Sequence, residues 1–214
     1  AWNTYDTERG VQKYLRSNAT AAESTAGTGA GLTSFNSNGF TLGKTWNTEN
    51  FNGYTYVSWS FRKAEKFFDV VTYTGTTANQ AISHGLGSVP GMIIVRALSG
   101  DNWFVWHNSL STSGVGSSTG HYKLILNSTA AKAVDNGVNT VTDSSFTVLG
   151  NNGETNSNGT SYVAYVFAND AGGFGDDDEN IIKCGSVTTN WSAVEVDVGF
   201  EPQFVIAKVA DRTD

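Results

Sequence analysis

The stretch Tyr162-Val163-Ala164-Tyr165-Val166-Phe167 decides the fold prediction, because both of its alternating sets of side chains are apolar. Side chains on a β-strand point alternately to opposite faces of the sheet, so a strand of this kind has to be covered on both faces. We therefore expect it to be the central strand of a sheet with apolar layers on either side.

Other apolar runs, rich in β-branched and aromatic residues, are typical of short strands. Gly, Ser, Thr and Asn separate them, and the chain has 24 Gly but only 2 Pro. Several short strands with turn signals between them predict an all-β fold built as an antiparallel β-sandwich. The further predicted strands are Phe67–Tyr73, Gly91–Ala97, Trp103–His107, Tyr122–Leu126 and Phe146–Leu149.

The central run has an earlier copy, Tyr56-Val57-Ser58-Trp59-Ser60-Phe61, which keeps one apolar face and carries serines on the other. Similar matches recur along the chain, so the sequence predicts tandem repeat units of about 100–112 residues, each a whole small domain. The matching pairs include Trp2 and Trp103, Asn18 and Asn127, Phe40 and Phe146, Tyr56 and Tyr162, and Gly87 and Gly199, at offsets of 101, 109, 106, 106 and 112 residues.

These matches divide the chain into four segments. Residues 1–66 are predicted to be the C-terminal part of one unit plus a linker, and residues 67–167 a complete sandwich. Residues 168–180 read as a Gly/Asp linker, and residues 181–214 as the N-terminal part of a further unit. Since the chain opens on Ala1 and its outer units are incomplete, we expect it to be an excerpt of a longer protein.

The composition argues against several classes of protein. With 15% charged and 12% aromatic residues, the chain is too apolar to be disordered. Its net charge of −7 argues against a nucleic-acid partner, because that affinity comes from Lys and Arg neutralising phosphates. No apolar run approaches the ~20 residues of a membrane-spanning helix. We expect no nucleic-acid binding and no membrane insertion.

The motifs in combination resemble the tandem-repeat tail-fibre or appendage proteins of tailed, notably marine, bacteriophages. One long motif of the complete unit and its shorter copy near the C-terminus carry the resemblance. The motifs are Tyr5-Asp6-Thr7-Glu8-Arg9-Gly10, Ile82-Ser83-His84-Gly85-Leu86-Gly87-Ser88-Val89-Pro90, Asn127-Ser128-Thr129-Ala130-Ala131 and Gly199-Phe200-Glu201-Pro202. The central unit departs from the pattern, with His107-Asn108-Ser109-Leu110 where the first unit has Asp6-Thr7-Glu8-Arg9.

The resemblance implies a virion structural protein with jelly-roll or lectin-like sandwich units that present a binding surface, for host glycans among other ligands. It implies assembly in the host cytoplasm and then an extracellular virion location, with other virion proteins as partners. We also expect a homo-oligomer, a trimer by analogy with fibrous virus proteins. One physical point supports it: incomplete sandwiches leave strand edges and a core face that something must cover.

Motifs for catalysis are not found. The sequence has no nucleophile elbow, no phosphate-binding Gly loop before a helix and no paired carboxylates in repeated positions, so we predict a protein that is not an enzyme. His84, His107 and His121 lack a metal-ligand spacing, and we expect His84 to fix a turn. Cys184 is expected to be a small buried apolar residue. A glycan-degrading fibre module and a bacterial surface adhesin remain the alternatives.

Two groups of residues are candidate sites. Clustered carboxylates can bind Ca²⁺ through oxygen, although the acidic run lacks the alternating pattern of a calcium loop and also fits a solvated linker. No other cofactor is expected. Aromatic rings in polar loops can stack on sugars, although burial is an equal possibility. The acidic run is Asp176, Asp177, Asp178 and Glu179, and the loop aromatics are Trp46, Phe51 and Trp191.

Turn residues complete the predictions. Gly87 and Gly199 are expected at turns that need a positive φ, and Pro90 and Pro202 at the first residue of the strand that follows each turn. Trp103 and Trp106 lie three residues apart, so on a strand they should point to opposite faces.

Overall fold

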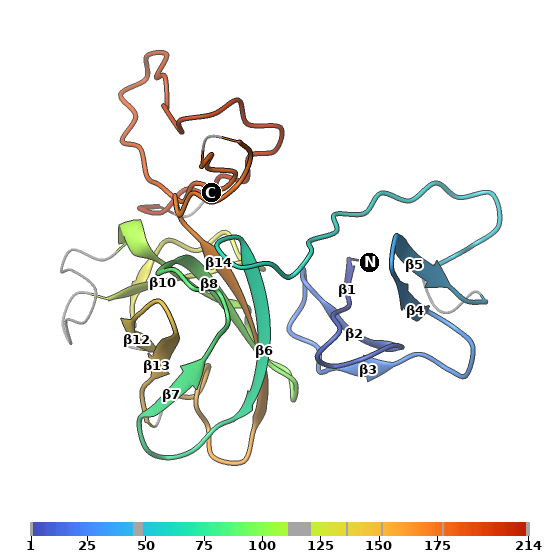
Figure 1. Cartoon of the computed structure of the whole chain (residues 1–214). Helices are drawn as coiled ribbons and strands as arrows, with labels where there is room; N and C mark the ends of the chain where they lie inside the picture. The colour runs from blue at the N-terminus through green and yellow to red at the C-terminus, as the bar shows by residue number, and fades with distance from the viewer. Residues whose placement is uncertain are drawn as a thin grey trace.

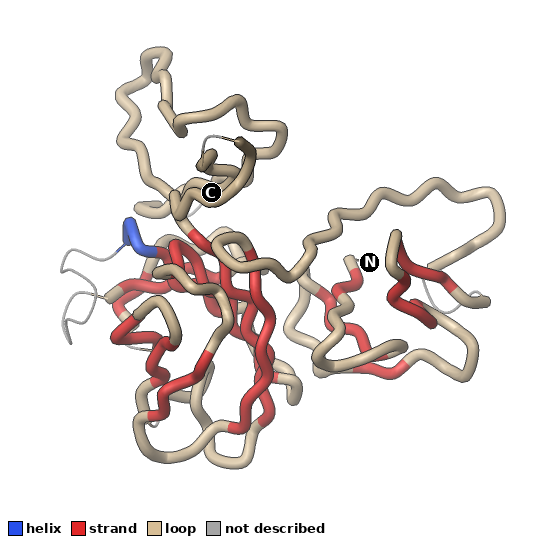
Figure 2. The backbone as a smooth tube through the Cα atoms, in the orientation of Figure 1, coloured by secondary structure: helices blue, strands red, loops and turns tan. Residues whose placement is uncertain are grey.

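The computed structural model describes residues 2–44, 49–110, 121–135, 137–150, 152–176 and 178–212. Its regular structure in these ranges is β-structure, apart from one short 3₁₀ turn, η1 (Asn108–Leu110) (Figures 1 and 2). The named strands pair antiparallel throughout. The predicted all-β fold is therefore confirmed. In the described ranges, no helix has the length and apolar character needed to cross a lipid bilayer.

The largest sheet has six strands in the order β11-β10-β9-β8-β14-β6. Its central strand, β14, pairs with β6 on one side and β8 on the other, and all but its first residue are buried. The expectation for Tyr162–Phe167 is thus confirmed. The six strands are β6 (Phe68–Thr74), β8 (Pro90–Ala97), β9 (Phe104–His107), β10 (Tyr122–Ile125), β11 (Ala133–Val134) and β14 (Ser161–Ala168).

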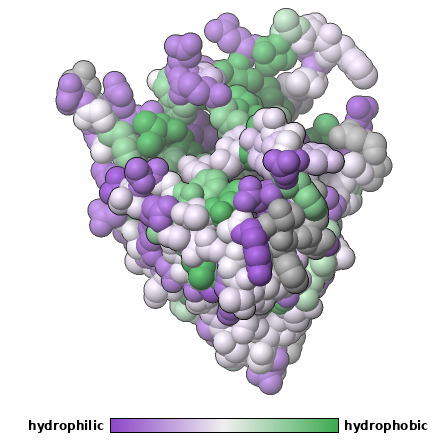
Figure 3. All heavy atoms as spheres, turned by 90° about the vertical axis from the view of Figure 1, so that its right-hand side faces the viewer, coloured by the Kyte–Doolittle hydropathy of each residue, from purple (hydrophilic) through white to green (hydrophobic). Residues whose placement is uncertain are grey.

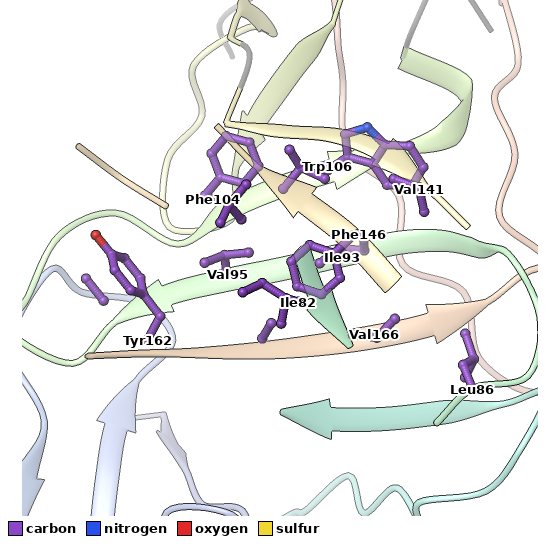
Figure 4. Packing of buried hydrophobic residues seen from close by; sticks show 14 of the residues in the cluster. Ile82, Leu86, Ile93, Val95, Phe104, Trp106, Val141, Phe146, Tyr162 and Val166 are labelled. Carbon is purple, nitrogen blue, oxygen red and sulfur yellow. The ribbon is translucent and has the colours of Figure 1, made fainter. Parts of the chain in front are cut away.

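A three-stranded sheet, in the order β12-β13-β7, covers one face of the large sheet. Figure 4 shows Phe146 and Ile82 of this small sheet facing Ile93 and Val166 of the large one. The two layers make a β-sandwich-like body over residues 68–168 whose core is apolar. The strands of the small sheet are β7 (Gln80–Ser83), β12 (Val138–Val141) and β13 (Ser145–Val148).

The six predicted strands of this body are all present, each to within a residue or so at its ends. Trp106 lies in the core between the sheets, whereas Trp103 lies in a second cluster on the outer face of the large sheet. The predicted opposite orientation of the two rings is confirmed, and both are buried. The strands β7, β11 and β12 were not predicted, because they are short and polar at alternate positions.

The N-terminal segment has a three-stranded sheet and a separate hairpin. The sheet contains β1 (Asn3–Thr4), β2 (Lys13–Arg16) and β3 (Ser24–Thr25), and the hairpin contains β4 (Leu32–Asn36) and β5 (Gly39–Leu42). Their pairings match those of β9 to β13 at the offsets of the sequence repeat. Thr4 pairs with Leu15 as Val105 pairs with Leu124, Tyr14 with Ser24 as Lys123 with Ala133, and Phe35 with Phe40 as Val141 with Phe146.

The outer segments differ from the central body in two places. Tyr56–Phe61, expected to superpose on the central strand, forms no strand and is exposed. In the described part of residues 180–214 there is likewise no strand, so Pro202 does not begin one, contrary to expectation. The physical reason is the same: β14 is held by β6 and β8, and neither segment has such neighbours here.

The turn before β8 has the expected geometry. Gly87 has a φ of +65° and Gly199 a φ of +81°, which favour glycine. His84 Nδ1 accepts a hydrogen bond of 3.3 Å from the backbone N–H of Leu86, and Pro90 is the first residue of β8. The limits of the four sequence segments stay a prediction.

Candidate functional site

The most elaborate polar cluster joins the N-terminal segment to the central strand of the large sheet. We call it the clasp; it consists of Asp6, Arg9, Glu23 and Tyr165. Arg9 donates from Nε to Asp6 Oδ2 at 2.6 Å and lies 3.2 Å from Glu23 Oε2. The hydroxyl of Tyr165 donates to Asp6 Oδ2 at 2.8 Å and accepts from Arg9 at 3.3 Å. Every group in the clasp therefore has a charged or hydrogen-bonding partner.

Burial decides the protonation of the clasp. It raises the pKa of the Tyr165 hydroxyl far above its usual range, with only partial opposition from Arg9. Burial by itself lowers the pKa of Arg9, but Tyr165 and Asp6 outweigh this effect and the net change is upward. Tyr165 stays a neutral donor and Arg9 a cation at all ordinary pH values. This arrangement suits a permanent joint rather than a proton-transfer site.

Apolar and backbone contacts extend the joint across the outer face of the large sheet. Leu15 is fully buried in a cluster with Trp103 and Tyr165. Trp103 Nε1 donates to the carbonyl of Arg16 at 2.9 Å, and Arg96 donates to the carbonyl of Ala21 at 2.6 Å. The N-terminal segment thus covers a sheet face that would otherwise be apolar and exposed.

A backbone hydrogen bond marks the centre of this joint and recurs at its other end. Glu23 N–H donates to the carbonyl of Leu98 at 2.8 Å, and Lys132 N–H donates to the carbonyl of Ala210 at 2.7 Å. The two donors are 109 residues apart and the two acceptors 112, which are offsets of the sequence repeat. Residues 208–211 therefore dock on the central body as residues 96–98 dock on the N-terminal segment.

Side-chain contacts support the second docking. Lys208 Nζ donates to the carbonyl of Ser128 at 2.8 Å, as its counterpart Arg96 donates to Ala21. Lys132 also forms an ion pair of 2.5 Å with Asp211. The same joint is thus used twice along the chain.

The loop aromatics proposed as ligand contacts are not brought together by any ring contact among the described residues. Trp191 is 99% exposed, and Phe51 is exposed and packs on Tyr54 at a ring separation of 5.9 Å. Trp46 lies outside the described residues. Whether any of the three binds a ligand stays a prediction.

A different set of exposed rings is gathered beside the joint. Trp2 and Trp59 are stacked at 5.5 Å with planes 7° apart, and Phe204 lies 6.3 Å from Trp59. All three are more than half exposed. Figure 3, viewed from the side of the N-terminal segment, shows apolar residues in green at this surface. The sequence analysis did not select these rings, although the match of Trp2 with Trp103 and of Trp59 with Tyr165 was a usable signal.

The titratable residues outside the clasp offer little for metal binding or nucleophilic chemistry. In the described ranges no group of three or more His, Cys, Asp and Glu could hold a metal ion; Asp176, Asp178 and Glu179 are exposed or half-exposed, and Asp177 lies outside these ranges. Burial raises the pKa of the Cys184 thiol to about 11, so the reactive thiolate is scarce at neutral pH.

An open hollow of about 330 Å³ lies next to the clasp. Polar residues from both parts of the chain line it, among them Glu8 and Lys13 of the N-terminal segment and Thr72 and Ser161 of the large sheet. Its walls therefore suit a hydrated polar ligand better than an apolar one.

Comparison with known proteins gives a family without a known activity. Residues 1–214 match the family model described as "Domain of unknown function (DUF7483)", so the chain belongs to that family. Neither the curated proteins nor the solved structures contain a match.

Proposed function

We propose that this member of the DUF7483 family is a structural repeat segment of a tail fibre or appendage of a tailed bacteriophage. In this proposal sandwich units of about 100–112 residues follow one another and the joint described above fixes each unit on the next. The protein is not an enzyme; it builds a rigid surface that other molecules bind.

The recurrence of one joint carries the proposal. The hydrogen bond from Glu23 to Leu98 and that from Lys132 to Ala210 connect equivalent positions of successive units. A contact repeated at the period of the sequence is what a tandem array requires, because each unit then meets its neighbour in the same way. The matching strand registers of β1–β5 and β9–β13 support the same architecture.

The joint also supports a mechanical role. The clasp places a buried cation between two carboxylates and a tyrosine hydroxyl, and Leu15 seals the apolar part of the contact. A contact of this kind resists bending more than a flexible linker does. Rigid spacing is useful to a fibre that has to hold a receptor-binding surface away from the particle.

The binding surface is proposed to include exposed aromatic rings and the polar hollow near the clasp. Trp191 projects into solvent, and the hollow offers charged and hydroxyl side chains. Rings that stack on sugars and polar groups that bond to hydroxyls are the chemistry by which proteins bind glycans. Host glycans are therefore the proposed ligand class.

Immunogold electron microscopy tests the virion assignment. Antibodies raised against the purified chain should label the fibres or appendages of particles of the phage that encodes it. Labelling of uninfected bacterial cells instead would indicate a surface adhesin. Release of sugars from host polysaccharide by the purified chain would indicate a glycan-degrading module.

A further inference from the structure

We infer that this chain binds a second copy of itself head to tail, with residues 202–209 of one copy inserted as a strand into the incomplete sandwich of the other. The site lies between β1 and residues 54–61, which we call the arm. This inference rests on the proposed repeat architecture and names the partner that completes its outer units.

The complete body shows what the site lacks. There, β8 lies between β9 and β14 and pairs with both. By the repeat offsets, β1 is the counterpart of β9 and the arm the counterpart of β14. β1 is the edge strand of its sheet, and the arm takes part in no strand pairing within the described residues. The position equivalent to β8 is therefore open at both of its edges.

Two aromatic pairs show that the flanks of the site have the geometry of the complete body. Trp103 and Tyr165, next to β8 on either side, stack at 6.1 Å with planes 19° apart. Their counterparts Trp2 and Trp59 stack at 5.5 Å with planes 7° apart. The N-terminal segment therefore already holds the two sides of the site in nearly the arrangement that a strand between them requires.

Residues 202–209 are the counterpart of β8 at an offset of 112, and their burial differs sharply from that of β8. Val205 is 70% exposed, whereas its counterpart Ile93 is 0% exposed. An extended segment with exposed Phe204, Val205 and Ile206 offers apolar side chains and unpaired backbone groups to a strand edge. The segment and the site are thus complementary in both respects.

The register follows from the complete body. There, Tyr162 pairs with Ala97, Ala164 with Val95 and Phe167 with Met92. The repeat offsets turn these pairs into Tyr56 with Val209, Ser58 with Ala207, and Phe61 with Phe204.

A second copy, rather than the chain's own segment, is the occupant because both parts are already fixed. The clasp holds the N-terminal segment on the large sheet, and Lys132 holds residues 210 and 211 elsewhere on the same body. Within one chain, Phe204 touches Trp59 at 6.3 Å but the strands do not pair. Pairing inside the chain would require one joint to break, whereas pairing with a second copy requires neither to break.

A contact of this kind joins two different surfaces and leaves one of each free on the resulting dimer. Such heterologous contacts continue into rings or open chains as the protein concentration rises. The completed sandwich of each contact would continue the order of units found along the sequence.

Disulfide trapping between separate chains tests the inference. One preparation carries Ser58→Cys and the other Ala207→Cys, both with Cys184→Ser to remove the native thiol. Both engineered positions are exposed, so the fold tolerates them. On mixing and mild oxidation, we expect a product of twice 22.8 kDa that neither preparation forms alone. As a matched control, Ile206→Cys replaces Ala207→Cys and should lose this product, because adjacent side chains point to opposite faces.

Two results would overturn the inference. The first is no cross-linked dimer, or equal amounts with Ala207→Cys and Ile206→Cys. The second is a cross-linked monomer as the main product of one chain carrying both Ser58→Cys and Ala207→Cys, which would assign the site to the chain's own segment. Hydrogen exchange at the Glu23 amide in the same samples separates the levels: if it is protected while cross-linking fails, only this inference is wrong.

Discussion

Replacing Arg9 by methionine removes the cation that the clasp is built around. The Arg9 side chain is 1% exposed, and its loss leaves the carboxylates of Asp6 and Glu23 together without their shared cation. Removing one partner of a buried pair costs about 3–5 kcal/mol, because the remaining charge stays desolvated. Tyr165 still donates to Asp6, which favours the lower end of that range.

Hydrogen exchange followed by mass spectrometry measures this cost where it arises. The backbone amides of Glu23 and Asp101 bond across the joint, to Leu98 and Thr20 respectively, so they exchange when the joint opens. Since 1.4 kcal/mol corresponds to a factor of ten, their exchange should accelerate by roughly a hundredfold or more, until the segment is open most of the time. Amides in β14 should be much less affected.

Lys13→Met provides the matched control. Lys13 also faces Glu23, but at 3.9 Å and with 49% of its side chain exposed, so its loss should cost about 0–1 kcal/mol. Equal acceleration in the two variants would refute the argument, since it would show that burial of Arg9 contributes nothing to the joint.

Three further outcomes follow from burial. Phe146→Ala should lower the unfolding free energy by about 3–5 kcal/mol, whereas Phe40→Ala, at the equivalent but 40% exposed position, should change it far less in the same urea titration. Burial lowers the pKa of His121, so the folded state disfavours its charged form; stability should be constant above the ordinary histidine pKa of about 6.5 and fall as pH drops below it, as thermal melts in a pH series will show. Cys184 should react with iodoacetamide at pH 8 far more slowly than it does in urea, because burial raises its pKa to about 11.

The central body could be predicted from the sequence because its strands have a clear alternating pattern. In Tyr162–Phe167 both faces are apolar, and this pattern alone indicated a central strand. The short strands β1 and β3 have two residues each, too few for any period to show, and they became recognisable only through the registers that they share with β9 and β11.

The clasp was harder to predict, because its partners lie 156 residues or more apart in the sequence. The motif containing Asp6 and Arg9 was noticed as part of a resemblance, but nothing in it identifies Tyr165 as the partner. The arm, conversely, was expected to be a strand from its pattern. It is not one here, because a strand needs neighbours as well as alternation.

The central claim, that residues 1–61 and residues 181–214 are complementary parts of one sandwich, is tested most directly by a fusion of two copies of this chain. Lys208 of the first copy and Trp2 of the second would be 8 residues apart, close to the 7 that separate Arg96 from Trp103. We predict that hydrogen exchange will show the arm of the second copy protected, with Tyr56–Phe61 exchanging as slowly as Tyr162–Phe167, while the arm of the first copy, in dilute solution, stays unprotected. Fast exchange in both arms would contradict the account.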